Sequence, residues 1–223
     1  MMRWNRAWVA VVAAACLLPG AAAVATQGRS ARIRVRETLT TDNVRTEESG
    51  LANVVADSIR ASAKAEVGLI AATSFATVTI GAGEAATQDF TRALVFRGDT
   101  VVLMRLSGSQ IKTALEHGLG LYPAKSAAFL QVSGISFEVN ASAPKGSRVV
   151  NLKVGKAPLV PDRVYSTAMP SPLAGGALVY SKAWSKADLE RETGITLDQA
   201  LADYLSTLTE ISGKGDGRIV VRK

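Results

Sequence analysis

Three residue types that carry much of protein chemistry are scarce in this sequence. Its 223 residues include one histidine, one cysteine and only 5% aromatic residues. A metal centre rich in histidine or cysteine is therefore excluded. A site built on a nucleophile and a histidine would have to use His117. The low aromatic content also argues against a base-stacking surface for nucleic acid.

The rest of the composition is that of a folded protein with a modest basic charge. Apolar residues make up 48% of the chain and charged residues 20%, which excludes wholesale disorder and allows a core without disulfides. The length permits one large domain or two small ones. Lys and Arg outnumber Asp and Glu by 26 to 19, a balance that suits an anionic small ligand or simply solubility.

The first 25 residues have the pattern of a secretory signal. Arg3 and Arg6 precede an apolar stretch over residues 7–18, and Ala23–Ala25 is a cleavage site with small residues at both ends. The stretch falls short of the roughly 20 apolar residues that span a membrane. We therefore predict an exported protein, periplasmic or extracellular, whose mature chain has no membrane span. Lipoprotein processing at Cys16 is the weaker alternative, because the residues after it are apolar.

The mature sequence changes repeatedly between strand and helix patterns, which predicts a mixed α/β fold of hairpins covered by helices. We expect a linker and the first strand over residues 26–39 and the main domain over residues 40–223. Residues 73–88 are rich in Ala, Thr and Gly and are expected to be irregular. The predicted strands cover residues 32–36, 67–71, 100–106, 129–139, 149–154, 164–169 and 218–222, with 129–139 and 149–154 paired.

Three helices are predicted, and capping residues mark their ends. Ser49 is the expected N-cap of a helix whose apolar stripe runs over residues 51–62. A second helix is expected to end at Gly118 as its C-cap. Thr196 and Gln199 have the spacing of a capping box in front of the last helix.

Six segments stand in order across roughly residues 40 to 220 and carry a shared signature. They are Val44–Asp57, Asp89–Phe96, Leu106–Leu119, Phe129–Ile135 (FLQVSGI), Gly194–Leu197 and Asp216–Ile219. Each segment alone is a weak match, but the series at this spacing is specific. Together the segments resemble the C-terminal domain of the 5'-nucleotidase family.

The resemblance implies a function in nucleotide catabolism. In that family a metallophosphatase domain with two metals carries out hydrolysis, and the C-terminal domain binds the nucleoside part of the substrate. One histidine cannot supply the several ligands of such a centre. The resemblance therefore implies a nucleotide-recognition module with no catalytic residue, metal or cofactor of its own. We expect it to work with a separate metallophosphatase chain that carries divalent metals.

Two alternative functions are also consistent with this sequence. The first is a non-enzymatic binding or scaffold protein of this fold that has lost nucleotide recognition. The second is an independent hydrolase with an unrecognised site.

The resemblance also places the first candidate substrate-binding residues. The family holds the base between two aromatic rings, and Phe96 matches the first ring if Arg97 is a one-residue insertion. Asp99 then stands where the family has Asn. At the second ring this sequence has Pro172, and Leu178 replaces a family Asp. The other interpretation of Phe96 is an ordinary core aromatic at a strand or turn edge.

A family Arg is also replaced, within residues 71–76. Phe75 lies in that loop, so we expect it to compensate, with Arg92, Arg97 and Tyr180 as further candidates. The expected binding set is therefore Phe96, Asp99, Phe75, Arg97 and Tyr180.

Other polar residues are interpreted as structural. His117 lies in the last turn of a helix, where its charge suits the helix dipole, and no nucleophile is near it in sequence. Asn53 and Asp57 lie one helical turn apart and are expected to serve the structure or to face a partner. The arginines of residues 29–36 are interpreted as the solvated face of a strand, with phosphate or an acidic partner as the alternative.

Overall fold

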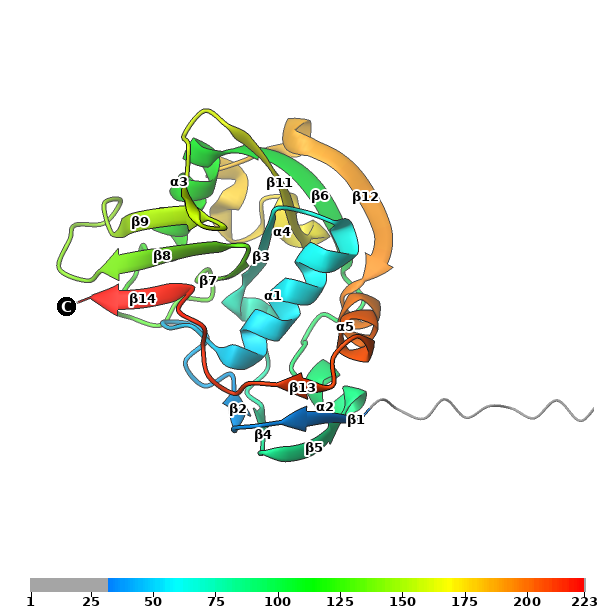
Figure 1. The fold of residues 1–223 in the computed structure, drawn as a ribbon. Helices are drawn as coiled ribbons and strands as arrows, with labels where there is room; N and C mark the ends of the chain where they lie inside the picture. Colours follow the sequence, from blue (N-terminus) through cyan, green and yellow to red (C-terminus); the bar gives the residue numbers. More distant parts are fainter. Residues whose placement is uncertain (1–31, 223) are drawn as a thin grey trace, which may run out of the picture.

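The computed structural model describes residues 32–222 (Figure 1). The predicted export signal, the alternative processing site at Cys16 and Arg29 lie outside the described residues. Within the described part, no helix has the length and hydrophobicity needed to cross a bilayer.

A mixed five-stranded sheet forms the centre of the fold. Only β3 and β11 pair in parallel, while the other neighbours are antiparallel. All five residues of β3 are buried, as expected for a strand covered on both faces. The strand order is β12 (Leu189–Thr196), β6 (Thr100–Ser107), β11 (Val164–Pro170), β3 (Val67–Ala71) and β7 (Leu130–Ser133).

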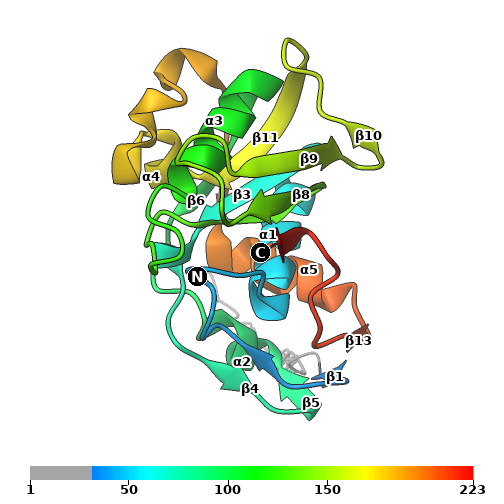
Figure 2. The same cartoon turned by 90° about the vertical axis from the view of Figure 1, so that its left-hand side faces the viewer.

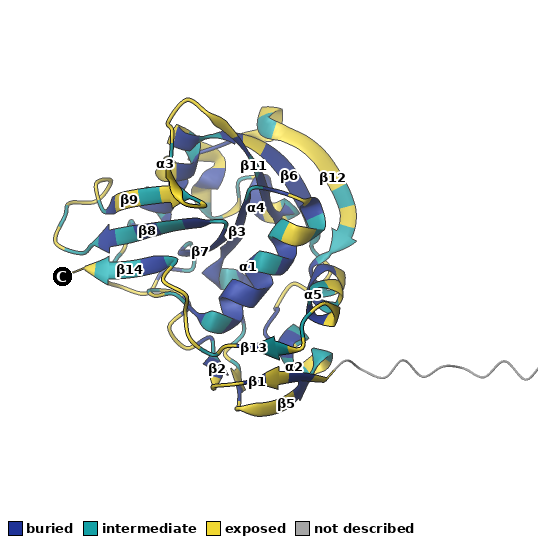
Figure 3. Cartoon of the chain, viewed as in Figure 1, coloured by how far each residue is buried: buried dark blue, intermediate teal, exposed yellow. Residues whose placement is uncertain are grey.

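Helices cover both faces of this sheet. Helix α1 (Gly50–Ala63) lies across one face with α5 (Leu197–Ser206) beside it, and Figure 3 shows most of α1 buried. Helices α3 (Gly108–Gly118) and α4 (Ser171–Ala174) lie on the other side of the sheet (Figure 2). The predicted N-cap of α1 is confirmed, because the Ser49 hydroxyl accepts a bond from the Ala52 N–H at 3.2 Å.

Three smaller sheets surround the central one. The largest has the order β10 (Ala157–Pro158), β9 (Val149–Val154), β8 (Ile135–Asn140) and β14 (Ile219–Arg222), with β14 parallel to β8. The others are β13 (Glu210–Ile211), β1 (Arg32–Val35) and β5 (Gly83–Ala86), and the pair β2 (Leu39–Thr40) with β4 (Thr79–Ile80).

The predicted single strand over residues 129–139 is wrong. The chain leaves the central sheet after β7 and enters the second sheet as β8, which does pair with β9 as predicted. The bend lies at Gly134, whose φ is +73°. A Cβ atom there would lie 2.0 Å from the Glu66 carbonyl oxygen, so only glycine fits.

The irregular stretch predicted over residues 73–88 is also wrong. It contains β4 and β5, and α2 (Thr87–Thr91) begins at its end. Its composition is a poor strand signal, and β5 is formed by pairing along the exposed edge of β1.

Gly118 does not act as the predicted C-cap. It is the last residue of α3, and the cap is Leu119 with φ −84°. A Cβ atom on Gly118 would lie 2.9 Å from the Ala128 carbonyl oxygen and 3.1 Å from the Tyr180 hydroxyl. Gly118 therefore lets the end of α3 lie close to Ala128 and Tyr180, and it does not form a left-handed turn.

Candidate functional site

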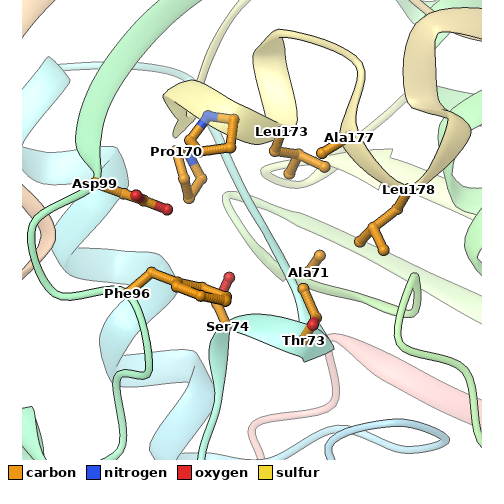
Figure 4. Close-up of a pocket in the computed structure, with 10 residues that line it drawn as sticks. Ala71, Thr73, Ser74, Phe96, Asp99, Pro170, Leu173, Ala177 and Leu178 are labelled. Atoms are coloured by element: carbon orange, nitrogen blue, oxygen red, sulfur yellow. The ribbon is translucent and has the colours of Figure 1, made fainter.

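A pocket of about 290 Å³ opens where the parallel strands β3 and β11 end (Figure 4). In parallel α/β sheets, ligands bind beyond the carboxyl ends of the strands, and β3 and β11 are the parallel pair of this mixed sheet. Here β3 runs into a short turn and β11 into α4. The lining residues are Ala71, Thr73, Ser74, Phe96, Asp99, Pro170, Pro172, Leu173, Ala177 and Leu178.

Phe96 and Asp99 come from the loop between α2 and β6 and share one side of the pocket (Figure 4). The Asp99 N–H donates to the Phe96 carbonyl oxygen at 3.1 Å, which closes a turn between them. The Leu197 N–H at the start of α5 donates to the Asp99 carbonyl oxygen at 2.9 Å. The phenyl ring remains 47% exposed, so Phe96 is not a core aromatic.

The polar groups of the pocket are unused by the protein. Within the described part of the chain, no hydrogen bond or ion pair involves the Asp99 carboxylate or the hydroxyls of Thr73 and Ser74. Partial burial raises the pKa of Asp99 above its ordinary value of 3.8. These groups are therefore available to a ligand.

The opposite wall is aliphatic and is built by residues 170–178. Leu178 and the following Val179 both have left-handed backbone, with φ of 57° and 68°. Such conformations cost about 1–3 kcal/mol each in non-glycine residues. His117 supports this backbone, because its Nε2 lies 2.8 Å from the Leu178 carbonyl oxygen.

Buried aromatic residues hold the same wall from inside. Tyr180 has no exposed surface, and burial raises the pKa of its hydroxyl, which donates to the Ala128 carbonyl oxygen. Its ring stacks on Trp184 with centroids 4.9 Å apart, and the His117 ring meets its edge at 4.8 Å. The Trp184 Nε1 donates to the Leu173 carbonyl oxygen at 3.0 Å.

The structure brings together two of the five expected binding residues. Phe96 and Asp99 line the pocket, whereas Phe75, Arg97 and Tyr180 do not. Phe75 is 6% exposed and packs in the core. The Arg97 Nε donates to the Leu94 carbonyl oxygen at 3.4 Å.

Sequence reasoning did not name Thr73, Ser74, Pro170, Leu173 or Ala177 as pocket residues. Small and aliphatic side chains carry no chemical signature. The available signal was positional, because these residues follow the two buried strands that end side by side.

Asn53 and Asp57 belong to a polar cluster that fixes the last strand to α1. Asp57 accepts two bonds from the Arg218 guanidinium, at 2.8 and 2.9 Å, and Asp216 accepts two more at the same distances. Burial alone would lower the pKa of Arg218, but its hydrogen bonds to both carboxylates raise it. Asn53 donates to Glu48 at 2.6 Å. Both residues thus have structural contacts here.

The arginines of β1 and of the residue that follows it have the exposed arrangement expected of a solvated face. Arg32, Arg34 and Arg36 alternate with buried Ile33 and Val35. Arg36 forms an ion pair with Glu210 at 2.5 Å.

Within residues 32–222, no group of three or more His, Cys, Asp or Glu residues is placed to hold a metal ion.

These features define a mixed α/β domain whose pocket has one aromatic residue, Phe96, in its described lining. The family described as 5'-nucleotidase, C-terminal domain, matches residues 23–183, more than half of the chain. The chain belongs to this family.

Known relatives are much longer than the matched part. The trifunctional nucleotide phosphoesterase protein YfkN of Bacillus subtilis is 30% identical over 80% of this chain and 13% of its own length. Human 5'-nucleotidase is 32% identical over 55% of this chain and 22% of its own. The crystal structure of a 5'-nucleotidase precursor from Thermus thermophilus aligns with a TM-score of 0.76 at 28% identity, over 85% of this chain and 39% of that one.

Proposed function

We propose that this domain is a nucleoside-recognition module for nucleotide catabolism, acting outside the cytoplasm. The observation that carries the proposal is the half-exposed Phe96 ring, which faces an aliphatic wall beside an unused carboxylate. An exposed aromatic face next to a few polar groups suits a flat heterocycle, because stacking provides affinity and hydrogen bonds provide orientation. The exported location rests on the signal pattern of residues 1–25.

The pocket suits the base rather than the phosphate. Its volume of about 290 Å³ is at the small end for ligand sites, so it holds one ring system better than a whole nucleotide. Its described lining contains one acidic residue and no Lys or Arg, which are the side chains that bind phosphate. We infer that the phosphate end of a substrate points out of this pocket.

Hydrolysis is proposed to take place on a separate metallophosphatase chain that carries divalent metals. One support is the single histidine in the sequence, which is too few for a two-metal centre. The other is that the relatives named as a nucleotide phosphoesterase and a 5'-nucleotidase are several times longer than the segment they share with this chain.

The purified chain provides the test. We expect adenosine, guanosine or AMP to raise the midpoint of thermal unfolding. A ligand at 100-fold its Kd should raise the free energy of unfolding by about 2.7 kcal/mol. We expect no phosphate release from AMP with Mn²⁺ or Zn²⁺. Phosphate release by the pure chain would contradict the division of labour. The absence of any shift with nucleosides would favour a scaffold protein instead.

A further inference from the structure

Asp99 is the one charged side chain that lines the Phe96 pocket within the described residues. It lies three residues after Phe96, on the same side of the pocket, and Figure 4 shows its carboxylate oxygens facing the cavity. No protein donor satisfies them in the described part of the chain. A partly buried carboxylate without a partner is unfavourable, as the raised pKa of Asp99 also indicates. A ligand that supplies donors would remove this cost.

The chemistry of the carboxylate restricts which base can do so. An ionised carboxylate only accepts hydrogen bonds, through two oxygens about as far apart as two neighbouring N–H groups. Guanine presents N1–H and the exocyclic N2–H₂ side by side. Adenine places acceptor nitrogens beside its exocyclic amine, and uracil flanks its N–H with two carbonyls. Hypoxanthine retains N1–H but has no amine beside it.

We propose that the pocket selects guanine among the bases and that Asp99 is its specificity-determining residue. The proposal rests on the proposed function, since it names the base that the nucleoside site takes. A purine stacked on Phe96 would present one edge to Asp99 and the other to the far end of the pocket. The free hydroxyls of Thr73 and Ser74 lie toward that end (Figure 4), where the O6 and N7 acceptors of guanine need donors.

The test is calorimetric titration of the purified chain with guanosine, inosine and adenosine. Inosine differs from guanosine only by the exocyclic amine, so the comparison isolates one bond to a charged acceptor. Such a bond corresponds to about 10- to 100-fold in Kd. We expect guanosine to bind more tightly than inosine by this factor, and adenosine to bind more weakly than guanosine.

The variant Asp99→Asn tests whether Asp99 determines the preference for guanine. An amide both donates and accepts, which suits adenine and mismatches the donor pair of guanine. We expect the variant to lose the preference for guanosine over inosine and to gain affinity for adenosine. Asp162→Asn is the matched control, because Asp162 is an exposed acid outside the pocket. It should leave every Kd unchanged.

The outcomes separate the two proposals. Equal affinity for guanosine and inosine, or an unchanged ratio in Asp99→Asn, overturns the guanine assignment while leaving nucleoside binding intact. If no nucleoside binds the wild-type chain at all, the proposed function itself fails. Thermal unfolding of Asp99→Asn in the absence of ligand confirms that the variant is folded.

Discussion

Phe96 leaves almost half of its ring exposed in a chain with only 5% aromatic residues. The other aromatic side chains near the pocket, Phe75, Tyr180 and Trp184, are buried and support the fold. The carboxylate of Asp99, beside Phe96, has no hydrogen-bond or ion-pair partner within residues 32–222. At the scale of single residues, the exposed face of the Phe96 ring and the unpaired Asp99 carboxylate are therefore both available to a ligand.

The first prediction concerns Phe96→Ala. Base stacking on an aromatic ring is worth about 1–3 kcal/mol, so nucleoside affinity should fall by about 5- to 150-fold in calorimetric titration. The unfolding midpoint should change little, because the ring is half exposed. Leu121→Ala is the control, since Leu121 is an exposed apolar residue that does not line the pocket. A large loss of stability in Phe96→Ala with unchanged affinity would show a structural role instead.

The second prediction concerns the pH dependence of Asp99. Its folded pKa is raised by burial, so the penalty on folding grows as the pH rises from the ordinary pKa of 3.8 to the folded pKa and is fully present above it. Below the ordinary value of 3.8 the group is protonated in both states and the penalty is absent. Asp99→Asn should therefore be stabilised relative to wild type at neutral pH, with the difference vanishing in acid. Denaturant unfolding at several pH values measures this, and a difference that grows in acid would contradict it.

At the scale of elements, Arg218 joins the last strand to the first helix. It lies just before β14 and binds Asp57 of α1, with side chains only 15% and 18% exposed. The Ser133 hydroxyl also donates to Asp57, which links β7 to the same cluster. Residues from both ends of the domain thus meet at one ion pair.

The third prediction is that Arg218→Met destabilises the domain by about 2–4 kcal/mol. Removing one partner of a buried pair costs roughly 3–5 kcal/mol, and the remaining exposure reduces this figure. The double variant Asp57→Asn/Arg218→Met should recover part of the loss, because no buried charge is then left unpaired. Denaturant unfolding gives both values. A double variant less stable than the single one would contradict this explanation.

The elements that could be predicted from sequence are those with a strong signal of their own. The buried strand β3 and the capped helices α1 and α5 follow from apolar spacing and capping residues. The strands β5 and β12 have little strand signal of their own, because β5 consists of Gly, Glu and Ala and β12 is largely exposed, and both form by pairing with a neighbour's edge.

The residues of the pocket could likewise be predicted only in part from the sequence. Phe96 and Asp99 were found through the family signature, which fixes positions along the chain. Phe75 is expected there from its place in the loop that lacks the family Arg, and Tyr180 as a further residue that could compensate, but both side chains are buried in the core. Burial depends on how distant segments pack, which spacing along the chain does not reveal.

At the scale of the whole molecule, the chain carries the fold of a 5'-nucleotidase C-terminal domain. It spans 13% and 22% of the length of the YfkN and human relatives. In the proposed division of labour, this domain recognises the base and a separate chain carries out hydrolysis.

The central claim is that a base stacks on Phe96 in the pocket at the ends of β3 and β11. The most direct measurement is nuclear Overhauser contact between the base protons of bound guanosine and the isotope-labelled chain. We predict contacts to the Phe96 ring and to the methyl groups of Leu173 and Leu178, which lie across the pocket from it. Contacts confined to another surface, or none at saturating guanosine, would contradict the claim.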